Sequence, residues 1–210
     1  MEDYEWVDHY RKVVCGLEKI ENRFTGYTNE NGLTCLSDYI SGKITPYLWQ
    51  DNHQKDETDF FTTVDRRENP YFQKVDIHFH NMGNKNLTFK LFFTCDSVRN
   101  VSASFYSPAD SYIYMYGKNT ISLLNGSGGN RIELSITERK HYDAIYRAME
   151  TGQLIHSPLA RGWVICLMMH EILLRPGEKR TVSSWQIHSQ SKEEALLLDW
   201  LIENQTSNYA

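Results

Sequence analysis

The alternation of apolar and polar residues between residues 75 and 137 constrains the fold of this 210-residue chain more than any other feature. Its apolar members are Val75, Ile77, Phe79, Phe89, Leu91, Phe93, Val101, Ala103, Phe105, Ile132, Leu134 and Ile136. Because successive side chains of a strand point to opposite faces, a period of two indicates strands with one buried and one solvent-facing side. Several such strands, spaced about 10 residues apart and joined by turn-rich segments, predict an antiparallel β-sandwich as the main body.

The same pattern predicts which side chains form the core. We expect one buried face to carry the apolar residues of three strong strands, namely Ile77, Phe79, Leu91, Phe93, Ile132 and Leu134. Two loops look like simple turns between strands. Asn125 to Asn130 is rich in glycine and predicts a hairpin connection between strands at 120–124 and 131–137. Arg175 to Glu178 has Pro then Gly at its centre, which suits a type II turn.

Helices are expected only at the periphery. Residues 138–150 place Tyr142, Ile145 and Met149 at helical spacing, and a glycine follows shortly after. Residues 191–203 predict a C-terminal helix, because Ser191 followed by Glu194 is a capping-box signature before an apolar face. Residues 1–23 could form an N-terminal helix or an extension, although the run at 12–17 fits a strand equally well.

Length and composition favour one domain over residues 1–210, because all-β domains often run to about 200–250 residues. The net charge is −5, and no run of Lys or Arg exceeds two residues. Phosphate backbones and anionic membrane surfaces require clustered positive charge, so we expect no nucleic-acid or membrane partner. The acidic N-terminus lacks an apolar signal core, which predicts a cytoplasmic protein.

The four cysteines, Cys15, Cys35, Cys95 and Cys166, form no C-x-x-C pair, so we expect reduced thiols. His78 and His80 share one face of a strand with Asp76, and an H-x-H pair can bind a metal. No third ligand can be placed, and a polar outer sheet face explains the pattern, so we predict neither a metal nor another cofactor.

Aromatic residues supply the other candidate ligand contacts. Tyr112 and Tyr114 belong to an alternating stripe that ends at Tyr116, and such faces can stack on the apolar side of sugar rings. Trp49 and Trp163 allow the same interpretation, with core packing as the alternative. The candidate ligand-binding residues are therefore His78, His80, Tyr112, Tyr114, Trp49 and Trp163. No G-x-S-x-G nucleophile elbow is present, so the sequence does not support a nucleophilic enzyme, although it does not exclude one. We favour a protein without enzymatic activity.

Short motifs in the C-terminal third resemble a known domain. They are G-Q-L at 152–154, R-G-W-V at 161–164, L-R-P-G-E at 174–178 and S-K-E-E-A at 191–195. Upstream, residues 72–81 resemble a strand of the same domain that ends in Asn before a turn, and residues 31–44 resemble its early hairpin. Their order resembles the β-sandwich (galactose-mutarotase-like supersandwich) domain that precedes the helical barrel of glucoamylase-type glycoside hydrolases and disaccharide phosphorylases. The resemblance could span residues 24–203.

This resemblance implies a sandwich fold, but it carries over no catalytic residue. Those enzymes hold their paired carboxylates in the helical barrel, and the sequence ends at residue 210 without one. We therefore expect a non-catalytic sandwich protein that binds carbohydrate or a protein partner. The alternatives are a mutarotase-like sugar epimerase, which would use a His and a carboxylate as acid and base, or an assembly protein with no small-molecule ligand.

Overall fold

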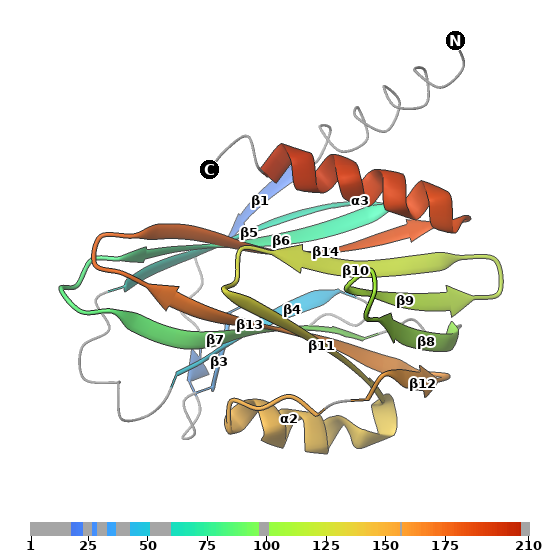
Figure 1. Cartoon of the computed structure of the whole chain (residues 1–210), viewed down its shortest axis with the longest axis horizontal. Helices are drawn as coiled ribbons and strands as arrows, with labels where there is room; N and C mark the ends of the chain where they lie inside the picture. The colour runs from blue at the N-terminus through green and yellow to red at the C-terminus, as the bar shows by residue number, and fades with distance from the viewer. Residues whose placement is uncertain are drawn as a thin grey trace, which may run out of the picture.

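A computed structural model describes residues 18–22, 27–28, 33–36, 43–50, 60–96, 101–155 and 157–206. Within these residues two antiparallel β-sheets lie face to face, with one helix against the outer side of each sheet (Figure 1). The predicted antiparallel sandwich is confirmed. No helix in the described part of the chain is both long enough and apolar enough to cross a membrane.

The larger sheet has eight strands among the described residues. In spatial order they are β1 (Glu18–Asn22), β5 (Phe60–Asn69), β6 (Phe72–Asn81), β14 (Lys179–Ser189), β10 (Ile121–Ser127), β9 (Tyr112–Gly117), β8 (Val101–Ser107) and β12 (Leu159–Arg161). The smaller sheet has six strands within the same described ranges. They are β11 (Arg131–Glu138), β13 (Val164–Leu174), β7 (Leu87–Asp96), β4 (Ile44–Trp49), β3 (Leu33–Cys35) and β2 (Tyr27–Thr28).

The main core lies between the sheets and is built from the alternating strands. Ile77 and Phe79 on β6 are buried in one cluster with Leu91 and Phe93 on β7 and with Leu134 on β11, as predicted. The prediction for Ile132 is wrong, since its side chain is 39% exposed. Ile132 lies near the beginning of β11, which is an edge strand, so the sandwich no longer encloses this end of the pattern.

The helices cover the outer faces of the two sheets (Figure 1). The short η2 (Arg139–His141) leads into α2 (Tyr142–Glu150), whose buried side chains pack on the smaller sheet. On the larger sheet, α3 (Lys192–Thr206) buries Ala195, Leu198, Leu201 and Ile202 against Phe72, Leu123, Trp185 and Ile187. Both predicted helices are therefore present.

The predicted capping residues begin α3. The Ser191 Oγ accepts a hydrogen bond from the Glu194 N–H at 3.1 Å. The Glu194 carboxylate accepts one from the Gln190 N–H at 3.3 Å, one residue earlier than in the usual capping box. These bonds satisfy backbone donors that a helix start leaves free.

Residues 18–22 form strand β1, which pairs antiparallel with β5. The rest of the segment for which a helix or an extension is expected, residues 1–17 and 23, lies outside the described residues. One expectation about a connection is wrong. The loop after β10 is not a hairpin connection, because β10 pairs with β9 and β14 whereas β11 pairs with β13 in the other sheet. The glycines carry the chain from one sheet to the other. Gly128 has φ +93° and lies so close to the Thr181 carbonyl that a Cβ would be 2.2 Å from its oxygen.

The turn at Arg175 to Glu178 matches its prediction. It joins β13 to β14, and Gly177 has φ +74°, the left-handed conformation that the second central residue of a type II turn requires.

Candidate functional site

The structure places the six predicted ligand contacts in three separate regions. His78 and His80 lie on the outer face of the larger sheet, on β6. Tyr112 and Tyr114 lie on the same face, on β9. Strands β14 and β10 separate β9 from β6, and α3 packs on β14 and β10. Trp49 and Trp163 belong to the region around the smaller sheet and α2. A single site that contains all six residues is therefore not formed.

His78 belongs to a hydrogen-bonded polar surface. His78 Nε2 lies 3.1 Å from Asp65 Oδ2, and its Nδ1 lies 2.9 Å from Thr181 Oγ1. Asp76 is buried, where it pairs with Lys74 at 3.0 Å and accepts a hydrogen bond from Ser183. Among the described residues, no group of three His, Cys, Asp or Glu side chains is placed to hold a metal ion.

The two tryptophans contact the helical side of the smaller sheet. The Trp49 indole N–H donates to the Glu150 carbonyl at 3.0 Å, and its ring packs so closely on Gly152 that a Cβ there would lie 2.6 Å away. Trp163 stacks against the Arg139 guanidinium, with 5.3 Å from the guanidinium carbon to the ring centre. These contacts hold α2 and its flanking residues in place.

Tyr112 and Tyr114 are largely built into the fold. The Tyr114 side chain is 1% exposed, and the Lys192 ammonium lies 4.9 Å from its ring centre. Burial raises the pKa of Tyr114 to about 12, and the neighbouring Asp110 carboxylate adds to this effect. The Tyr112 hydroxyl donates to Asp199 at 2.8 Å, and burial together with this bond raises its pKa as well. Tyr114 is therefore closed to a ligand, whereas Tyr112 is half-buried and its hydroxyl is engaged by Asp199.

The more accessible aromatic rings are those of Phe105, on the neighbouring strand β8, and Tyr116, near the end of β9. Phe105 on β8 pairs with Tyr114, and Tyr116 on β9 lies diagonally beside it. The Phe105 and Tyr116 rings are half-buried and nearly parallel, with an interplanar angle of 12° and centroids 5.6 Å apart. Leu159 on β12 pairs with Phe105 and is 53% exposed. We refer to Phe105, Tyr116 and Leu159 as the aromatic surface.

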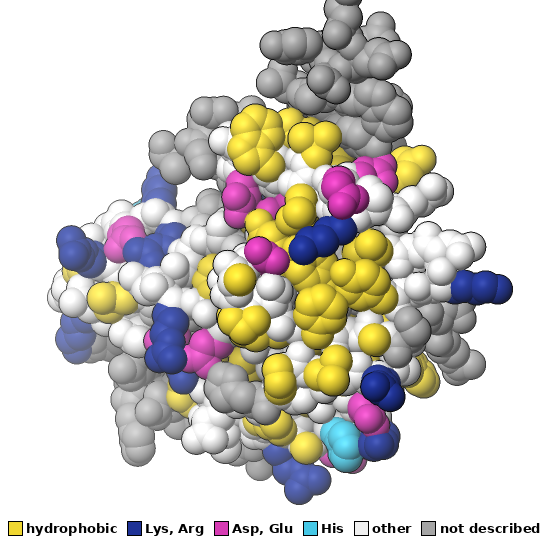
Figure 2. Space-filling model, turned by 45° about the vertical axis from the view of Figure 1, so that its right-hand side comes forward, with side chains coloured by type: hydrophobic (Ala, Val, Ile, Leu, Met, Phe, Trp, Pro, Cys, Tyr) yellow, Lys and Arg dark blue, Asp and Glu magenta, His cyan; other side chains and the backbone are white. Residues whose placement is uncertain are grey.

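Charged side chains lie at the rim of the aromatic surface. Lys192 Nζ is 3.9 Å from Asp110 Oδ2, and the Ser107 hydroxyl donates to the same oxygen at 2.9 Å. Figure 2 shows hydrophobic side chains gathered below the C-terminal helix, with a basic side chain among them and acidic ones at their border. The arrangement combines apolar ring faces with groups that can exchange hydrogen bonds with hydroxyls.

The position of α3 decides which part of the sheet remains open. Asp199 is buried and accepts hydrogen bonds from Trp185 Nε1 at 2.7 Å and Asn125 Nδ2 at 3.0 Å, in addition to the Tyr112 hydroxyl. These donors come from β14, β10 and β9, so one carboxylate fixes the helix over the middle of the sheet. Beside the helix, Phe105 on β8 is half-buried against the edge of this cluster, and Leu159 on β12 is 53% exposed.

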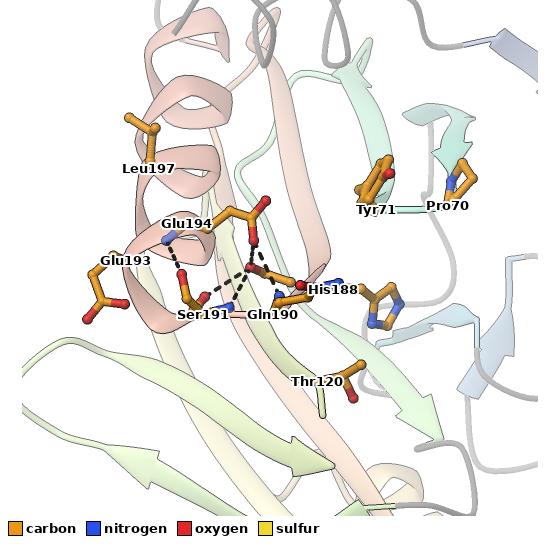
Figure 3. A pocket seen from close by; sticks show the side chains of 10 residues that line it. Pro70, Tyr71, Thr120, His188, Gln190, Ser191, Glu193, Glu194 and Leu197 are labelled. Atoms are coloured by element: carbon orange, nitrogen blue, oxygen red, sulfur yellow. Dashed lines mark hydrogen bonds between the residues drawn. The ribbon is translucent and has the colours of Figure 1, made fainter. Parts of the chain in front are cut away.

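A cavity of about 770 Å³ opens at the beginning of α3 (Figure 3). Its described lining comes from the β5–β6 turn, the β9–β10 turn, the end of β14 and the first two turns of α3. The residues are Pro70, Tyr71, Thr120, His188, Ser189, Gln190, Ser191, Glu193, Glu194 and Leu197. This volume is in the range of small-molecule sites, which span about 300–1,000 Å³.

Two ionisable groups of this cavity, His188 and Glu194, are engaged in the fold rather than paired with each other. His188 Nδ1 lies 2.8 Å from the Ser122 hydroxyl, and burial, with Lys43 nearby, lowers its pKa. The Glu194 carboxylate accepts from Ser189 and from the Gln190 N–H. In Figure 3 the His188 ring is turned away from Glu194. In this cavity His188 and Glu194 are therefore not placed as an acid–base pair.

Other lining side chains are free for a ligand. Within the described residues no side-chain hydrogen bond engages the Tyr71 hydroxyl, Thr120, the Gln190 amide or the Glu193 carboxylate. Tyr71 is 52% exposed. The sequence analysis missed these four residues, as well as Phe105 and Lys192 as contacts of one surface. Strand register alone brings Phe105 beside Tyr116, and a single sequence does not contain that information.

No protein-family model matches this sequence, and no curated protein matches it. Solved structures with a similar arrangement include a putative aldose 1-epimerase from Escherichia coli K12, with a TM-score of 0.37, 7% identity, and coverage of 75% of this chain and 68% of that chain. A bacterial glucoamylase in complex with acarbose gives a TM-score of 0.38 and 12% identity, covering 92% of this chain and 39% of that chain.

A putative kojibiose phosphorylase from the human microbiome gives a TM-score of 0.37 and 7% identity, covering 91% of this chain and 24% of that chain. The neighbours therefore include the kinds of protein whose sandwich domain the sequence resembles. The chain spans well under half of the glucoamylase and the phosphorylase. At these identities and TM-scores the similarity does not bear on activity.

Proposed function

We propose that this β-sandwich is a non-catalytic carbohydrate-binding protein and that its ligand packs on the aromatic surface. The observation that carries the proposal is the pair of half-buried, nearly parallel rings of Phe105 and Tyr116. The apolar face of a pyranose ring packs well on an aromatic face, and aromatic side chains supply much contact area with little loss of conformational freedom. Lys192 and Asp110 lie beside the rings and suit the hydroxyl groups at the edge of a sugar.

The same geometry supports binding without catalysis. Glycosidic cleavage requires two placed carboxyl groups, about 5–10 Å apart, whereas Asp110 is held by Ser107 and lies beside Lys192. A mutarotase-like reaction requires an acid and a base that reach the sugar together, whereas His188 and Glu194 bond to other partners. An open surface also buries only part of its ligand, so we expect weak affinity, with Kd about 1 mM or above.

The test is a binding titration with short neutral oligosaccharides. Maltotriose, cellotriose and chitotriose are added to the labelled protein, and backbone amide resonances are followed by NMR. At least one sugar is expected to shift resonances of β8 and β9, with a Phe105→Ala/Tyr116→Ala variant losing about ten-fold or more in affinity. Met82→Ala, which removes an exposed apolar side chain from the β6–β7 turn, serves as the matched control and is expected to bind like the unaltered protein.

Two results would contradict the proposal. One is that none of the sugars shifts the β8 and β9 resonances at concentrations up to tens of millimolar, the range of very weak binding. The other is equal affinity of the double variant and the Met82→Ala control. Recovery of a protein partner that depends on Phe105 and Tyr116, in the absence of sugar binding, would reassign the aromatic surface to protein recognition.

A further inference from the structure

We infer that the ligand is an oligosaccharide chain, which runs from the aromatic surface past the β9–β10 turn into the cavity at the beginning of α3. This inference rests on the proposed function and names the class of carbohydrate. A single sugar would contact only one of the two regions, whereas a chain would contact both. Two separate structural connections place the regions next to each other.

The first connection is the β9–β10 turn. Tyr116 on the aromatic surface pairs across the strands with Ile121, and Thr120, the residue immediately before Ile121, lines the cavity. The Gly117 N–H donates to the Thr120 carbonyl at 2.8 Å and closes the turn. One tight turn therefore has a ring of the aromatic surface on one strand and a wall of the cavity at its tip.

The second connection is the first turn of α3. Lys192 places its ammonium over the Tyr114 ring beside the aromatic surface, and the next residue, Glu193, lines the cavity. Consecutive residues of a helix rise by about 1.5 Å and point about 100° apart around the axis. The same helical turn therefore contributes a side chain to each region, and a ligand that follows its N-terminal end would touch both.

The chemistry of the cavity suits a neutral, hydroxyl-rich chain. Tyr71 offers an exposed ring, and Thr120, Gln190 and Glu193 offer donors and acceptors that no described side chain engages. The charged side chains of the described lining are glutamates, and a lowered pKa keeps His188 neutral near pH 7. An anionic saccharide would meet like charge here, so we assign the site to neutral oligosaccharides.

Joining two weak contacts through one ligand makes the second contact intramolecular and raises the overall affinity. The expected signature is a rise in affinity with chain length. From disaccharide to hexasaccharide, we expect a gain of about ten-fold to a hundred-fold, the lower part of the avidity range for linked contacts. A site restricted to the aromatic surface would show little gain beyond the trisaccharide.

The experiment measures dissociation constants for two series, maltose to maltohexaose and cellobiose to cellohexaose. Each series is titrated into the full chain, a Thr120→Ala/Gln190→Ala variant and a matched control, Thr88→Ala/Gln153→Ala. The control removes the same two residue types from exposed positions on β7 and after α2. The readout is the ratio of hexasaccharide to disaccharide affinity, and the cavity variant is expected to lose most of that ratio whereas the control keeps it.

The outcomes separate the inference from the proposed function. If no saccharide of any length binds, the proposed function itself is wrong. If disaccharides bind but affinity does not rise with length, or if the cavity variant keeps the full ratio, the aromatic surface stands alone and the inference is overturned. A hexasaccharide of glucuronic acid units that binds as tightly as the neutral chains would overturn the assigned charge class.

Discussion

Replacement of Asp199 by alanine should weaken the packing of α3 on the larger sheet and so lower the free energy of unfolding. The carboxylate is buried and accepts from Trp185, Asn125 and Tyr112 at 2.7, 3.0 and 2.8 Å. A buried donor left without an acceptor costs about 1–3 kcal/mol, and the Trp185 and Asn125 donors lie deepest in this network. The Tyr112 hydroxyl is half-buried and can turn towards water. We therefore expect a loss of about 3–5 kcal/mol in the free energy of unfolding.

Urea unfolding followed by circular dichroism and tryptophan fluorescence measures this loss directly. Asp199→Asn keeps one acceptor oxygen, so its loss should fall between those of the alanine variant and the unaltered protein. Glu193→Ala is the matched control, because it removes an exposed carboxylate from the same helix and should change stability by less than about 0.5 kcal/mol. An Asp199→Ala variant within about 1 kcal/mol of the unaltered protein, the net value of one ordinary hydrogen bond, would refute the role of Asp199 as the anchor of α3.

Three further predictions test other parts of the fold. Burial lowers the pKa of His170 to about 3. Below about pH 6.5 the unfolded chain therefore binds a proton at His170 that the folded chain does not bind. The free energy of unfolding should fall by up to about 1.4 kcal/mol per pH unit from pH 6.5 towards pH 3. His170→Leu should flatten this dependence, and equal slopes in urea unfolding from pH 7 to pH 4 would contradict the assignment. Gly128→Ala should lower the free energy of unfolding by more than about 3 kcal/mol, because backbone strain and the overlap with Thr181 add. Gly177 has a similar φ and open space around it, so Gly177→Ala should cost only about 1–2 kcal/mol. Similar thermal midpoints for the two variants would contradict the contribution of the Thr181 contact. Ser191→Ala should cost about 1 kcal/mol through the lost cap of α3, and an unchanged unfolding midpoint would argue against that cap.

The strands were predictable because their signal is local. The two faces of β6 and β7 have different surroundings, and alternating residues such as Ile77 and His78 show this difference in the sequence. The C-terminal helix was predictable for a related reason, since Ser191 and Glu194 act within one turn. Features that depend on contacts within a few residues leave a readable pattern.

The errors arise where the outcome depends on distant partners. The glycine-rich segment after β10 has the composition of a hairpin turn, and composition does not tell which sheet the next strand joins. Ile132 fits the apolar period of β11, but its exposure depends on what lies beyond the edge of the sheet. In both cases the tertiary context decided the result, and the local pattern did not record it.

The candidate site shows the same dependence most clearly. Tyr112, Tyr114 and Tyr116 alternate on one face of β9, so the sequence predicts correctly that they share a side. Which ring is accessible is decided by α3, and the contact between Tyr112 and Asp199 joins residues 87 positions apart. Lys192 covers Tyr114, whereas the rings of Tyr116 and Phe105 remain partly open beyond the helix. The boundary of the aromatic surface is therefore set by how the C-terminal helix docks. A change that releases α3 should alter the aromatic surface and the cavity as well as the stability, because Lys192 lies beside the aromatic surface and Glu193 lines the cavity.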